Sequence, residues 1–294
     1  MKIKIKILLT GKNGQLAKTI VSHLKKDYKF ISYSKQRLDI TKKNEIEKYV
    51  KIHKPRFLIN TAAYNDVEKS EKKDLQSKKV NCLGVKNLKE ICFENNVFLI
   101  HFSTDYVFDG KQNMPYKELL KPKPINKYGK SKLDGEKILL SSKKLNFIIL
   151  RLSWVYSNLG KNFLTKIVKQ IKKNNNLNVV SDQFGIPTST GFVVFYLNKI
   201  LKEIIKGEKF EKIYHLTPNG NTTWYGFSKM ILKFLKKNSN TRFTKINILP
   251  TTSNFKGKAL RPLYSVMSSK KIQKKLNNSF HDWKFYFRKH CIDK

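Results

Sequence analysis

The chain has 294 residues, of which 40% are hydrophobic, enough for one large domain or for a domain with a smaller lobe. It holds no run of about 18 apolar residues, so we expect no membrane-spanning helix and no membrane partner. Its three cysteines are odd in number and lack metal-type spacing, which favours a reducing cytoplasmic location over a disulfide framework.

The net charge of +40 comes from 61 lysines and arginines against 21 aspartates and glutamates. A charge of this size first indicates nucleic-acid binding. The excess is mostly lysine, however, and it is spread from Lys2 to Lys294 among many asparagines and isoleucines, as in "IKKNNNLNVV" at 171–180. We interpret it as compositional drift and expect no specific nucleic-acid partner, although a positive field attracts anionic ligands.

The first half of the chain alternates strand-like and helix-like segments. Short apolar runs lie at residues 5–10, 30–33, 57–62, 97–102 and 147–152. Segments with helical spacing of apolar residues separate them, at 16–24, 44–53, 80–92 and 130–140. Continuous apolar strands between helices are typical of a parallel sheet covered on both faces. We therefore predict an α/β, Rossmann-like, doubly wound domain over residues 1–156.

The pattern loosens in the second half. Helices are predicted at 162–172, 192–205 and 225–236, with strands at 177–180 and 213–216. Glycine and proline gather around 185–191 and 218–226. We expect residues 157–294 to form a smaller C-terminal substrate lobe, with some segments returning to the first domain.

A glycine turn, "LLTGKNGQLA" at 8–17, joins the first strand to the first helix. Gly11 suits the tight turn, Gly14 lets the backbone approach a pyrophosphate, and Ala17 allows close packing of helix on strand. The N–H groups at the helix start would face the phosphates. We predict a dinucleotide site here; the plainer interpretation is a tight turn built from small residues.

The residues after the second strand bear on the choice of dinucleotide. NAD enzymes usually place an acid about 20 residues beyond the glycines, where it binds the ribose 2′-hydroxyl. At that place the chain reads "YSKQR", with Ser34, Lys35 and Arg37 and no acid. Hydroxyl and basic groups suit a 2′-phosphate, so NADPH is expected, with NADH as the alternative.

Two further motifs carry candidate chemistry. In "HFSTDYVFDG" at 101–110, an apolar strand ends on four polar side chains, Ser103, Thr104, Asp105 and Tyr106. In "KYGKSKLDGEK" at 127–137, Tyr128 and Lys132 lie four apart, on one face of a helix. An ammonium beside a phenol lowers its pKa, so we expect Lys132 to lower the pKa of Tyr128 toward neutrality.

Taken together, these motifs resemble the dTDP-4-dehydrorhamnose reductase family of extended short-chain dehydrogenase/reductases. The resemblance runs nearly end to end, through "GKNGQLA", "LDIT", "NTAAY", "FSTDYVFDG", "YGKSKLDGE", "RLSWVY", "DQFGIPT" and "YHLTPNGNTTW". It implies NADPH-dependent reduction of the 4-keto group of dTDP-4-dehydro-β-L-rhamnose to give dTDP-L-rhamnose.

The resemblance also implies roles for individual residues. Catalysis would fall to Thr104, Tyr128 and Lys132, and Asn81 would brace the active-site strand. The cofactor would be held by Gly11, Asn13, Gly14, Gln15, Leu16, Asp39, Ile40, Ala62, Ala63, Tyr64, Tyr128 and Lys132. The nucleotide sugar would be held by Thr104, Asp105, Tyr106, Trp154 and Arg261.

The tail departs from the family pattern. It reads "RPLYSVMSSKK" from Arg261, with Tyr264 and Ser268 at positions where the family usually has other polar groups. Gly191 and the basic C-terminus offer no acidic set for a bridging metal, so we expect no metal and either a monomer or a homodimer. These departures leave open a reductase of another nucleotide-linked 4-keto sugar. A non-catalytic regulatory subunit of methionine adenosyltransferase type is a further alternative, disfavoured by the retained Thr104, Tyr128 and Lys132.

Overall fold

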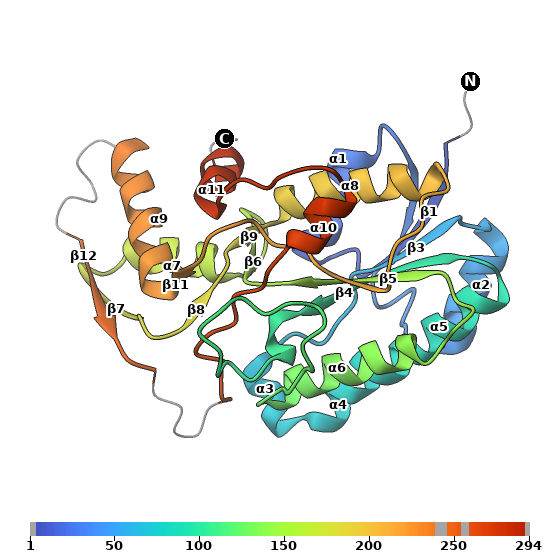
Figure 1. The fold of residues 1–294 in the computed structure, drawn as a ribbon, viewed down its shortest axis with the longest axis horizontal. Coiled ribbons are helices and arrows are strands. Elements are labelled where there is room, and N and C mark those ends of the chain that lie inside the picture. Colours follow the sequence, from blue (N-terminus) through green and yellow to red (C-terminus); the bar gives the residue numbers. More distant parts are fainter. Residues whose placement is uncertain (1–3, 239–245, 254–258, 292–294) are drawn as a thin grey trace.

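A computed structural model describes residues 4–238, 246–253 and 259–291. Its centre is a parallel sheet of six strands in the order β2-β1-β3-β4-β5-β10 (Figure 1). The strands are β1 Lys6–Thr10, β2 Lys29–Ser32, β3 Phe57–Asn60, β4 Phe98–Thr104, β5 Phe147–Leu152 and β10 Ile213–His215. The strand order reverses between β1 and β3, and the crevice outside the carboxyl ends at such a reversal is where open α/β sheets bind ligands.

Helices cover both faces of this sheet. Above it in Figure 1 lie α1 (Gln15–Leu24) and α8 (Thr190–Ile205), and below it lie α2 (Lys43–His53), α5 (Gly84–Glu94) and α6 (Lys127–Leu140). Each face has its own apolar core, because side chains of continuous apolar strands such as Ile7, Leu8 and Leu9 are buried alternately on the two sides. The predicted doubly covered α/β sheet is confirmed.

The helix predicted at 80–92 is longer and irregular in the structure. It begins after α3 (Val67–Lys72) as α4 (Asp74–Lys78), widens into a π-helical turn, η1 (Lys79–Leu83), and continues as α5. Such π turns are rare and are frequent at functional sites. The turn packs closely on α6, since a Cβ on Gly135 would lie 2.3 Å from the Asn81 carbonyl oxygen.

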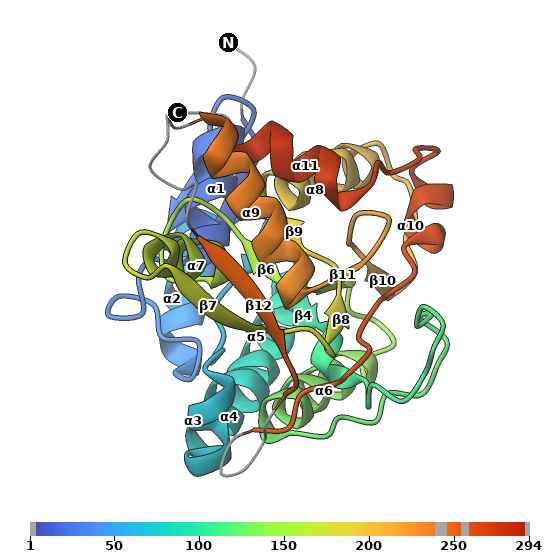
Figure 2. The same ribbon diagram turned by 90° about the vertical axis from the view of Figure 1, so that its left-hand side faces the viewer.

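Beside the large sheet, a second core forms around small paired strands (Figure 2). The strands β7 (Asn176–Val180) and β12 (Asn247–Thr251) pair in parallel, and α7 (Phe163–Ile171) and α9 (Trp224–Asn238) pack on each other. Short pairs lie between this core and the sheet: β6 (Val155–Tyr156) with β9 (Thr188–Ser189), and β8 (Phe184–Gly185) with β11 (Thr222–Thr223).

The chain beyond residue 156 also contributes to the large sheet. Strand β10 is its edge strand, and α8 packs on α1. Further along, α10 (Lys270–Lys275) contributes Ile272, and α11 (Trp283–Cys291) contributes Tyr286, to the core on that face. Because segments on both sides of residue 156 build the large sheet and its covering layer, the division into domains at residues 1–156 and 157–294 stays a prediction. Within the described ranges, no helix is long and apolar enough to cross a bilayer.

Candidate active site

A cavity of about 330 Å³ lies at the carboxyl ends of the central strands. The first turn of α1, the tip of β4 and the start of α6 all reach it, and α9 closes it from the side of the second core. Its lining includes ten residues predicted for the site: Gly14, Gln15, Leu16, Ala63, Thr104, Asp105, Tyr106, Tyr128, Lys132 and Trp154. Residues distant in the sequence thus meet where a doubly wound sheet places its ligands.

The glycine turn has the shape of a phosphate cradle. Gly11 has φ +72°, and a Cβ there would lie 2.9 Å from the Ala62 nitrogen, so a larger residue would clash with the end of β3. Gly14 caps α1, and no side chain caps its first N–H groups. These N–H groups have no partner within a helix and can bind an anion. The turn therefore fits a dinucleotide pyrophosphate.

The basic segment after β2 lies next to this turn. The Lys12 N–H donates to the Tyr33 carbonyl oxygen at 3.2 Å, which brings the turn beside Ser34. Lys35 and Arg37 are both exposed there. A 2′-phosphate at this edge would lie near the positive charges of Lys35 and Arg37. Residues 33–37, "YSKQR", contain no carboxylate that would repel it.

Asp39 and Ile40 are occupied by local contacts. The Asp39 carboxylate accepts hydrogen bonds from both the N–H and the hydroxyl of Thr41, each at 2.9 Å. Ile40 is buried in the core below the sheet, against Gly84. Neither side chain is among those that line the cavity, so their expected place beside the adenine stays a prediction.

Asn81 on the π turn holds two elements together. Its Oδ1 accepts from the Tyr64 N–H, and its Nδ2 donates to the Tyr64 carbonyl oxygen, both at 3.0 Å. Nδ2 also lies 2.9 Å from Ser131 Oγ on α6. Asn81 thus braces the segment after β3 against α6, rather than the β4 strand itself.

Thr104 and Tyr128 meet inside the cavity. Their hydroxyl groups are hydrogen-bonded, and the Tyr128 ring packs edge-on against Tyr106 with centroids 5.9 Å apart. Burial raises the pKa of Tyr128 to about 12, opposed by the Thr104 hydrogen bond. The expected lowering of this pKa by Lys132 is therefore wrong for this structure. The cause is burial, which disfavours the phenolate, and the tyrosine stays protonated at neutral pH.

Lys132 points to the β4 backbone instead. Its ammonium donates to the Phe102 carbonyl oxygen at 2.7 Å and lies 3.4 Å from His101 Nε2. Burial lowers the pKa of Lys132 to about 8, although Glu136 favours the charged form. The spacing of four put tyrosine and lysine on one helical face, as predicted, and the lysine can fasten that face to the strand.

Asp105 is the centre of a buried cluster of hydroxyl groups that sequence reasoning missed in part. Ser265 Oγ donates to its carboxylate at 2.6 Å, Ser153 Oγ at 3.0 Å and Thr104 Oγ1 at 3.1 Å. Burial raises the pKa of Asp105 to about 6, partly offset by these hydrogen bonds. The carboxylate therefore ties β4 to the segments after β5 and near the C-terminal tail, in addition to lining the cavity.

Trp154 lines the cavity with one face already covered. Its ring stacks on Trp224 of α9, with centroids 3.4 Å apart and planes inclined by 6°. Its edge lies so close to Gly185 that a Cβ there would be 2.3 Å from Trp154 Cε2. Trp224, which ends the "YHLTPNGNTTW" motif but was given no role in the site, is thus a lining residue, held by a 3.2 Å bond from its Nε1 to Gln183 Oε1.

Arg261 lies outside this cavity but next to it. Its guanidinium pairs with Glu68 and hydrogen-bonds the Tyr106 hydroxyl. It lines an adjoining cavity of about 370 Å³, together with Lys166, and Trp224 borders both cavities. Two basic side chains in a cavity that meets the reaction site suit the diphosphate of a nucleotide sugar.

Ser103 has a buried polar atom beside the cavity. Ser103 lines the cavity, and its buried Oγ has no hydrogen-bond partner in the described part of the chain. Buried hydroxyl groups are rarely left unpaired, and an unpaired one calls for an explanation. A bound cofactor or substrate would provide it.

Among residues 4–238, 246–253 and 259–291, no cluster of three His, Cys, Asp or Glu side chains could hold a metal.

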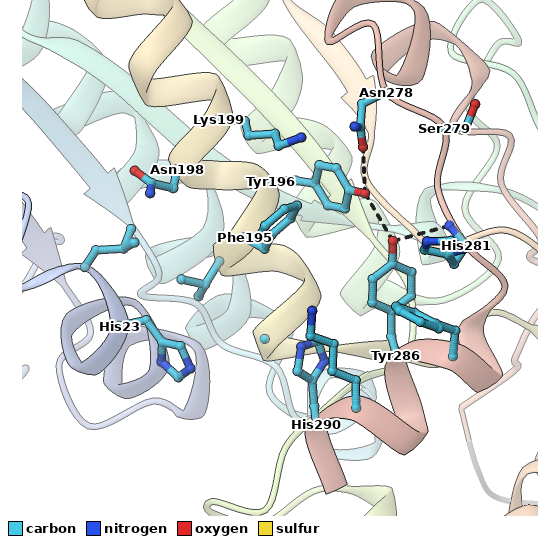
Figure 3. Close-up of a pocket in the computed structure, with 15 residues that line it drawn as sticks. His23, Phe195, Tyr196, Asn198, Lys199, Asn278, Ser279, His281, Tyr286 and His290 are labelled. Atoms are coloured by element: carbon cyan, nitrogen blue, oxygen red, sulfur yellow. Dashed lines mark hydrogen bonds between the residues drawn. The ribbon is translucent and has the colours of Figure 1, made fainter. Parts of the chain in front are cut away.

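Another hollow, of about 560 Å³, lies on the outer side of α8, between α1 and α11 (Figure 3). It shares no lining residue with the cavity at the strand tips. Its wall carries His23, Lys199 and His290, and its floor is the hydrogen-bonded pair Tyr196 and Tyr286, whose hydroxyls are 3.1 Å apart. It contains none of the residues predicted for catalysis or cofactor binding, so we place the reaction at the strand tips.

The fold and the Thr104–Tyr128–Lys132 site together define an oxidoreductase of the extended short-chain dehydrogenase/reductase class. Within this class, the chain belongs to the RmlD substrate binding domain family, whose model matches residues 5–293. The predicted family is thereby confirmed.

Individual relatives agree with this assignment. The chain is 34% identical over 282 residues to dTDP-4-dehydrorhamnose reductase of Aggregatibacter actinomycetemcomitans, covering 95% of each chain. It is 30% identical to dTDP-4-keto-6-deoxy-D-glucose reductase of Streptomyces niveus, covering 88% of this chain and 87% of that protein. A crystal structure of dTDP-4-dehydrorhamnose reductase from Bacillus anthracis in complex with NADP superposes with a TM-score of 0.91 at 29% identity, covering 99% of this chain and 100% of that chain.

Proposed function

We propose that this chain reduces the 4-keto group of dTDP-4-dehydro-β-L-rhamnose with NADPH and releases dTDP-L-rhamnose. The observation that carries the proposal is the single cavity in which the glycine turn of α1 faces the hydrogen-bonded pair of Thr104 and Tyr128. The similarity to dTDP-4-dehydrorhamnose reductases over nearly the whole chain supports the choice of substrate.

The cofactor, when bound, supplies the hydride. The N–H groups at the start of α1 bind its phosphates, and the fold neighbour from Bacillus anthracis, described with NADP, supports NADPH. Lys35 and Arg37 provide positive charge for the 2′-phosphate, and NADH is the weaker alternative. Gly11, Asn13, Ala62, Ala63 and Tyr64 complete the cofactor site in this proposal.

Tyr128 is the general acid. Because burial keeps its hydroxyl protonated at neutral pH, it can donate a proton to the ketone oxygen as negative charge develops there. The Thr104 hydroxyl stabilises the same oxygen by a hydrogen bond. Lys132 holds the helix that carries Tyr128 against β4, through Phe102. Trp154 and Tyr106 enclose the sugar, and Arg261 reaches toward its diphosphate.

Another nucleotide-linked 4-keto sugar is the second candidate substrate. The relative from Streptomyces niveus, named for dTDP-4-keto-6-deoxy-D-glucose, supports it. The unusual tail residues Tyr264 and Ser268 are not among the lining residues of the cavity. Both candidates use the same catalytic groups and differ in the sugar alone.

The direct test is to mix the purified protein with NADPH and each 4-keto sugar nucleotide in turn. We expect loss of NADPH absorbance with dTDP-4-dehydrorhamnose at a kcat/KM clearly above that for other sugars, and a product that comigrates with dTDP-L-rhamnose. Turnover of another sugar at a higher kcat/KM would favour the second candidate. No turnover of any 4-keto sugar would overturn the reductase proposal. The cytoplasmic location and the choice between monomer and homodimer stay predictions.

A further inference from the structure

Four buried polar side chains form a continuous line behind the reaction cavity. Thr10, Asn60 and His101 come from the neighbouring strands β1, β3 and β4, and Lys132 follows on α6. Thr10 Oγ1 donates to Asn60 Oδ1 at 2.6 Å, and Asn60 Nδ2 lies 3.0 Å from His101 Nδ1. His101 Nε2 then lies 3.4 Å from Lys132 Nζ. The donor and acceptor roles along this line therefore determine whether a proton or a lone pair of His101 faces the Lys132 ammonium.

The Ala62 backbone fixes the orientation of the Asn60 amide. The Ala62 N–H lies 3.1 Å from the Asn60 atom that also receives the Thr10 hydroxyl proton. A backbone N–H can only donate, so this atom must be the oxygen. The amide nitrogen of Asn60 consequently faces His101 and donates to it.

The donor from Asn60 in turn fixes the proton on His101. Nδ1 must present a lone pair to the amide nitrogen. Burial and the charge of Lys132 hold the pKa of His101 well below its ordinary value, so the ring is neutral and carries one proton. That proton lies on Nε2, the nitrogen that faces Lys132.

An N–H group therefore points at the lysine nitrogen. A lysine ammonium has three donors and no acceptor, whereas a neutral amine has a lone pair that can accept. His101 thus opposes the charged form of Lys132. Glu136 on the same helix and Cys82 on the π turn favour the charged form, but both Glu136 oxygens are bound by Arg151, at 2.6 and 2.9 Å.

We propose that Asn60 and His101 are positioning residues that aim an N–H group at Lys132 and so weaken its hold on its proton. This inference rests on the reductase function proposed above, in which Tyr128 gives its proton to the substrate. The ammonium form of Lys132 donates to the Phe102 carbonyl oxygen and so fastens α6, which carries Tyr128, to β4; loss of its proton therefore sets the alkaline limit of turnover.

Asn60→Asp is the substitution that reverses the donor and acceptor roles of the two His101 nitrogens. One carboxylate oxygen still accepts from Ala62, but the other now faces Nδ1 of His101, which takes the proton. Nε2 becomes an acceptor for the lysine ammonium. We expect the alkaline limb of the pH profile of kcat/KM to move up by roughly one pH unit. His101→Phe, which removes the N–H group, should move it in the same direction.

Asn96→Asp is the matched control. It makes the same charge change at an exposed residue before the opposite end of β4, and we expect the limb to stay in place. An unchanged limb in folded Asn60→Asp would overturn the proposal, as would an equal shift in Asn96→Asp.

Nitrogen NMR of isotope-labelled histidines tests the same inference without turnover. We expect His101, assigned by the loss of its signals in His101→Phe, to show the Nε2–H tautomer in the unmodified protein and the Nδ1–H tautomer in Asn60→Asp. An Nδ1–H tautomer in the unmodified protein would overturn the inference. If the tautomers are as expected but no 4-keto sugar is turned over, it is the reductase function that fails.

Discussion

The ammonium of Lys132 donates a hydrogen bond to the carbonyl oxygen of Phe102 at 2.7 Å. Phe102 precedes Thr104 by two residues on β4, so this bond fastens α6 to the strand that carries the catalytic hydroxyl. Tyr128, one turn earlier on α6, is thereby held within hydrogen-bonding distance of Thr104. Substitutions at the site should therefore distinguish side chains that take part in the reaction from side chains that hold the reacting groups in place.

Tyr128→Phe removes one hydroxyl group and keeps the ring that packs against Tyr106. We expect kcat to fall by about 10²–10⁴-fold, the usual contribution of a general acid, while NADPH affinity hardly changes. Steady-state kinetics and a fluorescence titration with NADPH measure the two effects. Tyr28→Phe, which loses a hydroxyl bonded to Asn198 outside the cavity, is the control and should keep full activity. Near-normal turnover of Tyr128→Phe would mean that another group supplies the proton.

Thr104→Ala should lower kcat by about 10²–10³-fold, as expected for loss of one donor to a developing oxyanion. Thr104→Ser keeps the hydroxyl, which also accepts from the Tyr106 N–H at 3.2 Å, and should retain most of the activity. Comparison of kcat for the two variants with the same sugar nucleotide makes the measurement. If the serine variant is as slow as the alanine variant, the hydroxyl is not the group that matters.

Asp105→Asn should change how stability depends on pH. Burial raises the pKa of Asp105 from its ordinary value of 3.8 to about 6, so its contribution to stability is full below about pH 4 and is lost as the pH rises through 6. The loss corresponds to about 3 kcal/mol. We expect the asparagine variant, measured by urea unfolding from pH 4 to pH 7, to lack this loss and so to gain stability relative to the natural chain as the pH rises.

Asp109→Asn is the control with the opposite sign. Although burial opposes it, hydrogen bonds from Tyr116 and from the Lys111 N–H lower the pKa of Asp109. Its stabilisation is present above the ordinary pKa and is lost as the pH falls, so its replacement should cost stability at neutral pH. The same pH trend in both variants would contradict the assignment for Asp105.

Lys35→Ala and Arg37→Ala test the choice of cofactor. If these side chains bind the 2′-phosphate, each variant should bind NADPH about tenfold more weakly, the effect of losing one charged hydrogen bond, and NADH as before. The natural chain should bind NADPH at least as tightly as NADH. Lys51→Ala, an exposed lysine paired with Glu47 on α2, is the matched control. Equal weakening of both cofactors would place the basic segment away from the 2′-position.

Gly185→Ala should displace the Trp154 indole, because the added Cβ would lie 2.3 Å from Trp154 Cε2. Overpacking of this kind typically costs about 1–3 kcal/mol. We expect KM for the sugar nucleotide to rise about tenfold while NADPH affinity is kept. Gly207→Ala strains a backbone with φ +98° where nothing lies within 4 Å, so it should lower the unfolding temperature without changing KM. An unchanged KM in Gly185→Ala would mean that Trp154 does not contact the sugar.

Much of the architecture could be predicted from the sequence, because it depends on local patterns. Apolar runs of strand length between helix-period segments predicted the parallel sheet, and the structure places β4 at Phe98–Thr104, close to the predicted 97–102. The glycine turn and the four-residue spacing of Tyr128 and Lys132 are also local, so both could be read directly. The end-to-end motifs were sufficient to predict the family.

Contacts between distant segments could not be predicted in the same way. Ser153 and Ser265 bind the carboxylate of Asp105 from 48 and 160 residues away, and Trp224 of α9 stacks on Trp154. A single serine or tryptophan carries no periodic signal, so only the packing of the two parts of the chain brings these side chains together.

The protonation of the site was likewise decided by tertiary structure. The helical spacing placed Lys132 beside Tyr128 in sequence, and this predicted a lowered tyrosine pKa. In the folded chain burial raises the pKa of Tyr128 to about 12, and the ammonium of Lys132 is directed to Phe102 and His101. A pKa depends on burial and on the direction of neighbouring donors, and both are set by contacts with β4 that spacing along α6 does not contain.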